Sequence, residues 1–245
     1  MPCVRILQLL IIVTLTTFYP VSYAKPFTIV LDSGHNPKQQ GALGVKGIYE
    51  VVYNDNLTAQ IAKTLREAGF FVILTRTPTQ DITLEERTQI ANTSDADLFL
   101  AIHHDSAQLK YLEKSTLNQF TTYHTTTPIA GYSIFASTLN SHFSESIEFA
   151  TLLGQNLLKL GRPPSTHHAE NIQGENRQWL NKALGIYQFD DLIVLKKTTI
   201  PAVLLEVGVI VDKEDEAYIS NQEKQDAIIQ AIVSALQEYN TKNSH

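Results

Sequence analysis

Residues 27–50, FTIVLDSGHNPKQQGALGVKGIYE, carry the clearest indication of the fold type. Residues 27–31 form a continuous apolar run rich in strand-forming side chains, which predicts a strand buried on both faces. The run is followed closely by His35, and a glycine-rich loop then leads to Glu50 at the start of a helical pattern. The buried strand therefore ends close to His35, and the loop brings the Glu50 carboxylate back towards the same place.

Strand and helix patterns alternate along the rest of the chain. Further strands are predicted at 70–75, 98–102, 132–135 and 202–205, and helices at 51–68, 83–92, 144–160 and 222–239. Thr83 with Glu86 three positions later forms a capping box at the start of the second helix. This alternation predicts a single α/β domain with a mostly parallel twisted sheet and helices on both faces.

The first 24 residues have the layout of a secretory signal peptide. Arg5 precedes an apolar run at 6–18, and Ser22-Tyr23-Ala24 places small residues where a signal peptidase cuts. An uncleaved membrane anchor is the alternative, but the run is short for a bilayer span. We expect an exported protein, periplasmic or secreted, without disulfides, since the single cysteine, Cys3, lies in the leader.

Charge and hydropathy restrict the class of partner. The formal net charge is −6 and lysines and arginines form no cluster, which argues against nucleic acid as a partner because binding to phosphates requires a basic face. No second apolar run is long enough to span a bilayer, so we expect no stable membrane insertion after the leader is removed.

Four polar residues are expected to meet at one edge of the sheet. His35, His103 and Glu206 each stand just past the end of a predicted strand, where ligands bind in open parallel sheets, and the glycine loop can bring Glu50 to the same edge. Two imidazoles and a carboxylate suit a hydrolytic zinc site that keeps its fourth position for water. A carboxylate that does not bind the metal, for which Glu206 is the candidate, can then act as general base and later as proton donor.

Each of these residues also has a purely structural interpretation. A single histidine at a strand end is usually a hydrogen-bonded surface residue, and Glu50 early in a helix is favourable to the helix dipole alone. Glu206 could be a capping or ion-paired carboxylate. The metal-site hypothesis therefore depends on their convergence and not on any one of them.

Four segments resemble, in order, the blocks of the zinc-dependent N-acetylmuramoyl-L-alanine amidases of the AmiC/CwlC type, the amidase_3 family. They are IVLDSGH with its glycine loop, TLEERTQIAN, ADLFLAIHHDS and IPAVLLEVGVI. The resemblance implies one Zn²⁺ ion held by His35, Glu50 and His103, with Glu206 as the catalytic glutamate. It also implies a catalytic amidase domain at 25–240, followed by a polar tail at 241–245. The implied reaction cleaves the amide between N-acetylmuramic acid and L-alanine of peptidoglycan.

The chain departs from the family pattern around the first histidine and after the second. Ser33, Asn36-Pro37 and Gln39 stand where the family has other residues, and they affect the expected loop shape more than metal binding. The segment 107–130 is longer than the usual connection, and its function stays open, as does the need for an activator protein.

Other polar residues are expected to have structural roles. Strand alternation directs His104 away from the metal, and Arg76 and Arg87 are expected to bridge strand and helix. His124, His167 and His168 are expected to be solvated loop residues.

Two other functions fit the same residues. One is a different exported zinc peptidase of the cell wall, and the other is a non-catalytic wall-binding regulator that kept the fold. The first would share the metal chemistry and differ only in its pocket.

Overall fold

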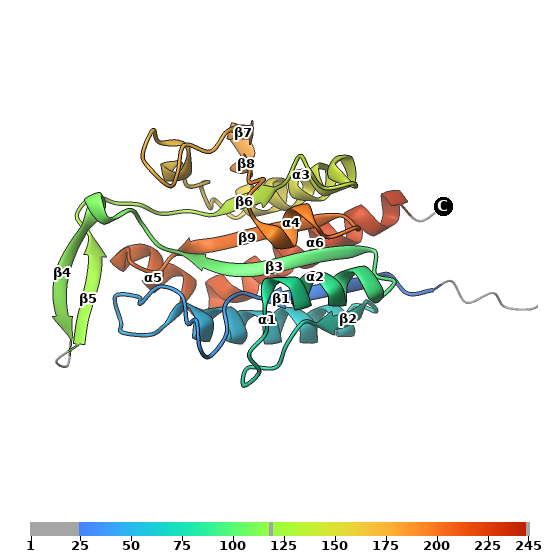
Figure 1. Ribbon diagram of the computed structural model, residues 1–245, viewed down its shortest axis with the longest axis horizontal. Helices are drawn as coiled ribbons and strands as arrows, with labels where there is room; N and C mark the ends of the chain where they lie inside the picture. Colours follow the sequence, from blue (N-terminus) through green and yellow to red (C-terminus); the bar gives the residue numbers. More distant parts are fainter. Residues whose placement is uncertain (1–24, 118–119, 244–245) are drawn as a thin grey trace, which may run out of the picture.

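The computed structural model describes residues 25–117 and 120–243, so the predicted signal peptide at 1–24 lies outside the described residues. Its centre is a seven-stranded sheet (Figure 1). In spatial order the strands are β2 (Phe71–Leu74), β1 (Thr28–Ser33), β3 (Leu98–Asp105), β9 (Ala202–Val209), β6 (Ser133–Ala136), β8 (Ile186–Gln188) and β7 (Trp179–Asn181). Strands β2, β1, β3 and β9 pair in parallel, so the predicted, mostly parallel sheet is confirmed.

Helices cover both faces of this sheet, as predicted. One face carries α1 (Glu50–Glu67), α3 (Phe143–Lys159) and α6 (Gln222–Asn243), and the other carries α2 (Leu84–Thr93) and the short α4 (Ile193–Lys196). A further short helix, α5 (Lys213–Ile219), follows β9. Three single turns of 3₁₀ helix, η1 (Leu109–Tyr111), η2 (His167–Ala169) and η3 (Lys182–Leu184), lie in the connections.

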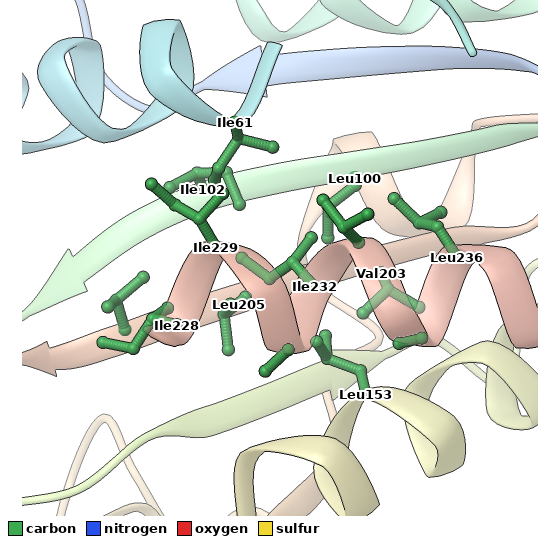
Figure 2. Close-up of a cluster of buried hydrophobic side chains, with 14 of the residues drawn as sticks. Ile61, Leu100, Ile102, Leu153, Val203, Leu205, Ile228, Ile229, Ile232 and Leu236 are labelled. Carbon is green, nitrogen blue, oxygen red and sulfur yellow. The ribbon is translucent and has the colours of Figure 1, made fainter. Parts of the chain in front are cut away.

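The larger core lies between the sheet and the helices α1, α3 and α6. Figure 2 shows Ile229, Ile232 and Leu236 of α6 among the side chains of β3 and β9, including Leu100 and Val203. The 3.6-residue spacing on α6 and the apolar runs of the strands bury these side chains together. Each such side chain contributes about 1.5–3 kcal/mol when it is fully buried.

Local signals in the sequence set several helix ends. The capping box is confirmed: Thr83 Oγ1 accepts from the Glu86 amide, and the Glu86 carboxylate accepts from the Thr83 amide. Gly69 follows α1 with φ +90°, a left-handed conformation that glycine adopts without a steric penalty. The last helix runs to Asn243, four residues beyond the predicted end at Tyr239, so part of the expected polar tail is helical.

The sheet is mixed on one side, within the mostly parallel arrangement that was predicted. Strand β6 pairs antiparallel with β9, and β7 pairs antiparallel with β8. The chain reaches β6 through the 107–130 segment, where β4 (Leu112–Leu117) and β5 (Phe120–Thr125) form a separate antiparallel hairpin that extends from one end of the molecule (Figure 1).

The base of the hairpin is attached to the end of β9. The Thr125 amide donates to the Val211 carbonyl at 3.0 Å, and Thr125 Oγ1 donates to Asp212 at 2.7 Å. A small apolar cluster of Ile129, Val209 and Val211 lies beneath it. This anchoring matters because an isolated two-stranded hairpin is marginally stable at best.

Candidate metal centre at the carboxyl edge of the sheet

His35, Glu50 and His103 meet at the carboxyl ends of β1 and β3. One Glu50 oxygen, Oε2, lies 2.9 Å from His35 Nε2, and the other, Oε1, lies 3.1 Å from His103 Nδ1. One ligand atom from each residue lies within 4.8 Å of the other two. The structure therefore brings together all three residues that the sequence analysis proposed as ligands.

Each residue reaches the cluster from a different element. His103 stands on β3, Glu50 is the first residue of α1, and His35 follows β1 with φ 62°. A positive φ is uncommon for a residue with a side chain, so surrounding contacts must hold His35 in place.

Two buried arginines supply those contacts. Arg76 Nε donates to the His35 carbonyl at 2.8 Å, and its Nη2 donates to the Gly34 carbonyl at 3.1 Å. Arg87 also donates to the His35 carbonyl, and its Nη1 donates to the Ser33 carbonyl at 2.6 Å. The expected structural role of both arginines is confirmed, and it consists of fixing the loop that carries a candidate ligand.

Two glycines leave room for the close approach of these side chains. A Cβ at Gly34 would overlap the His103 imidazole, and a Cβ at Gly41 would overlap the Glu50 carboxylate. Gly41 also has φ +75°. The glycine-rich loop thus brings the chain from the end of β1 to the start of α1 around the cluster.

The Glu50 carboxylate is buried, with 5% of the residue exposed. Burial alone would raise its pKa, but the hydrogen bonds with His103 and His35 outweigh that effect and lower the pKa below its ordinary value. Asn54 Nδ2 donates to Oε1 at 3.1 Å. Glu50 is therefore an ionised, oriented carboxylate, which is the form that binds a metal.

His104 faces away from this cluster. Its Nδ1 lies 2.7 Å from Asn54 Oδ1, and its ring packs against Tyr53 on the α1 side of the sheet. Burial lowers its pKa to about 3, so the ring is neutral. The expected orientation of His104 is confirmed.

Glu206 is the register partner of His103 on the neighbouring strand. Paired residues of parallel strands project from the same face of a sheet, so Glu206 shares the face of His103. Its Oε2 is buried and has no hydrogen-bond partner among the residues that the structure describes. Burial, and then the negative charges of Asp105, Glu50 and Glu175, raise the pKa of Glu206 well above its ordinary value.

The donor set fits a zinc ion on its chemistry. Two imidazole nitrogens and one carboxylate oxygen are the ligands of hydrolytic zinc, and they leave a fourth position for water. His35 and His103 have 29% and 19% of their side chains exposed, so the cluster is open on one side.

A cleft begins at the two histidines and continues along the surface. Its inner part, of about 290 Å³, is lined by His35, His103, Arg87 and apolar side chains of α4 and β9. An adjoining hollow of about 440 Å³ shares Asn36, Gln39 and residues 82–84 with it. Two of the residues that depart from the family pattern around His35, Asn36 and Gln39, thus line the cleft.

A second cluster was not predicted from the sequence. Asp105 Oδ2 lies 3.2 Å from His167 Nε2 and 2.7 Å from His168 Nε2. The expectation that His167 and His168 are solvated was wrong, because the two residues are only 3% and 6% exposed, and the His168 ring packs against Phe135 and Tyr187. Asp105 lies two residues after His103 on the same strand, and this spacing was the available signal.

The expected exposure of His124 is confirmed, but this residue belongs to strand β5 and not to a loop. It lies on the hairpin with 40% of its side chain exposed, 3.9 Å from Glu113.

Among residues 25–117 and 120–243, no helix combines the length and the apolar character needed to cross a membrane.

Comparison with known proteins places this geometry in a family. The family model described as N-acetylmuramoyl-L-alanine amidase matches residues 29–238. A putative N-acetylmuramoyl-L-alanine amidase of Buchnera aphidicola is 25% identical over 236 residues, which cover 91% of this chain and 98% of that protein.

Solved structures show the same fold. The amidase Ami1 of Mycobacterium smegmatis superimposes with a TM-score of 0.69 at 19% identity, covering 89% of this chain and 98% of that one. The CwlD amidase of Clostridioides difficile, solved in complex with the GerS lipoprotein, gives a TM-score of 0.66 at 21% identity, covering 89% of this chain and 100% of that one. With the family model spanning nearly the whole described domain, this chain belongs to the Amidase_3 family and is an N-acetylmuramoyl-L-alanine amidase.

Proposed function

We propose that this amidase is zinc-dependent, with His35, Glu50 and His103 as the ligands and Glu206 as the general base and acid. The observation that supports this most strongly is the meeting of the three ligand atoms within 4.8 Å, beside a glutamate that is the register partner of His103. The bond cleaved is the amide between N-acetylmuramic acid and L-alanine of the stem peptide.

The zinc ion, when bound, would lower the pKa of a water molecule and polarise the scissile carbonyl. Glu206 Oε2, which has no partner within the described residues, would take a proton from the attacking water. The same oxygen would then give this proton to the nitrogen of L-alanine as the amide bond breaks. A raised pKa suits the second role, because it favours the protonated carboxyl group that gives the proton to the leaving nitrogen.

The cleft beside His35 and His103 is the proposed place for the substrate. Its apolar wall, which includes Leu84, Leu192 and Val194, can exclude water around the scissile bond, and Asn36 and Gln39 can hydrogen-bond to the peptide or the sugar.

The products of digestion test this proposal. Purified protein incubated with sacculi should release stem peptides that begin with L-alanine, as identified by mass spectrometry, and a chelator should abolish the release. Products cut within the stem peptide would instead indicate another zinc peptidase. A protein that binds sacculi and releases nothing would be a non-catalytic regulator.

Export is part of the same proposal. It is supported by the leader pattern at 1–24 and by the location of peptidoglycan outside the cytoplasm. N-terminal sequencing of the exported protein should begin at Lys25, and a sequence that begins at Met1 would contradict the cleavage.

We further propose that this amidase needs a protein activator. The proposal is supported by the complex of the similar CwlD amidase with GerS. The purified chain alone should then act slowly on sacculi. Full activity without any partner would remove the need for an activator.

A further inference from the structure

We propose that Asp105, His167 and His168 bind a second divalent transition-metal ion, of the same class as zinc, next to the first centre. The proposal goes beyond the amidase chemistry, which requires only one ion. The donor set repeats that of the first cluster, with two imidazoles and one carboxylate whose ligand atoms lie within 4.8 Å of one another.

The orientation of the two imidazole rings is the first argument. His168 Nδ1 lies 2.9 Å from Glu175 Oε2, and His167 Nδ1 lies 2.7 Å from Ser165 Oγ. Both Nδ1 atoms therefore have a partner, and both Nε2 atoms point at Asp105 Oδ2. Histidine ligands of metals are typically held in this way, with the second nitrogen bound to a carboxylate or another oxygen that fixes ring orientation.

An unsatisfied buried atom is the second and independent argument. Among the described residues, His167 Nε2 is a buried atom without a well-formed hydrogen bond, although it lies 3.2 Å from Asp105 Oδ2. A buried polar nitrogen without a partner is destabilising, because it loses its hydrogen bonds to water on folding. A metal ion among His167, His168 and Asp105 would give this atom a bond.

The balance of charge is the third argument. The negative charges of Asp105, Glu50 and Glu175 act on Glu206, so four carboxyl groups lie near one another. Arg177, with Nε 3.6 Å from Glu175 Oε2, offsets one of them. A second divalent cation would balance this charge at the side where Asp105 lies.

The competing state is a buried ion pair without a metal. Burial disfavours a charged His168, but Asp105 and Glu175 on its two sides prevail and raise its pKa to about 9. A proton would then occupy the place that we assign to the metal, and direct measurement of metal content separates these two states.

The probe is Zn²⁺ itself, measured per chain by mass spectrometry of the purified protein after dialysis against buffered zinc. We expect two zinc ions in the wild type, one in His168→Gln and two in His124→Ala, the matched control on the exposed hairpin. Glu175→Gln, which keeps all three ligands, should weaken one of the two zinc affinities by about 10- to 100-fold.

The first centre is followed in the same experiment. His35→Ala should lose one ion and keep the other, so failure of the two proposals can be told apart. One zinc ion in the wild type that His35→Ala removes and His168→Gln keeps would overturn the second site and leave the first intact. If His168→Gln does not fold, the wild-type count and the Glu175→Gln titration still decide.

Discussion

The two histidine–carboxylate clusters have the same donor types and opposite surroundings. In the first, His35 and His103 have 29% and 19% of their side chains exposed and border a cleft of about 290 Å³. In the second, the side chains of His167 and His168 are only 3% and 8% exposed. An ion in the first cluster would meet water and substrate, whereas an ion in the second would be enclosed by protein. The same ligands can therefore serve catalysis at one place and structure or charge balance at another.

The supports of the two clusters differ as well. The first depends on a glycine-rich loop and on the left-handed His35, held by Arg76 and Arg87. The second depends on a strand residue, Asp105, and on a single 3₁₀ turn. The first should therefore be sensitive to changes in its loop, and the second to changes in packing.

Among the variants, His103→Ala should produce the largest difference between the two clusters. Removal of this ligand should abolish amidase activity on sacculi and remove one zinc ion, while the second cluster keeps its own. The measurement is turnover together with zinc content, and His124→Ala serves as the control with both unchanged. If His104→Ala, and not His103→Ala, emptied the first cluster, the assigned strand register would be wrong by one residue.

Glu206→Gln should reduce turnover by about 10²–10⁴-fold, the range of general acid–base catalysis. It should keep both the fold and the zinc of the first cluster, because the carboxylate is proposed to move protons and not to bind metal. Turnover and zinc content are measured beside Glu113→Gln, an exposed hairpin control. A variant that purifies with less zinc would make Glu206 a ligand.

Arg76→Lys should weaken zinc binding at the first cluster by about 10- to 100-fold, the usual effect of changing a residue that orients a ligand. Lysine keeps the charge that faces Asp55 but lacks the planar fork that reaches the carbonyls of Gly34 and His35. Zinc titration measures the change. Arg162→Lys, at a buried pair with Asp215, is the matched control and should leave both affinities unchanged.

The smallest effect concerns the acid side of the pH–rate profile. Burial and neighbouring carboxylates raise the pKa of Glu206, so activity should decline on acidification at a pH above 4.5, where the base becomes protonated. His168→Gln removes a positive charge on the Asp105 side, whether that charge is a metal or a proton. This change should raise the pKa further and move the decline to higher pH.

At a fixed acidic pH we expect a rate loss of less than about tenfold in His168→Gln, which corresponds to less than one pKa unit. The residual rate of Glu206→Gln should lack the part of this decline that protonation of Glu206 causes. A decline that moves to lower pH in His168→Gln would contradict the assigned charges.

Much of the site follows from local patterns. The apolar run before Asp32 predicts a buried strand, and the shared direction of the parallel strands places His35, His103 and Glu206 towards one edge of the sheet. The predicted strand ends were too early, because β3 and β9 continue to Asp105 and Val209, so His103 and Glu206 lie within these strands and not past them. The capping box at Thr83 and the helical spacing on α6 are likewise readable, since a cap and a 3.6-residue period depend only on near neighbours.

Tertiary structure decided the features that depend on residues far apart in the sequence, namely strand pairing and burial. The antiparallel pairing of β6 with β9 depends on the path of the chain through the β4–β5 hairpin, which no local pattern encodes. His168 is buried against Phe135 and Tyr187, which are remote in sequence. By itself the sequence determined which strands supply the candidate metal ligands and the candidate catalytic glutamate, because strand periodicity is local. Only the packing of remote segments decided that a second cluster lies beside the first, because long-range contacts set burial and charge.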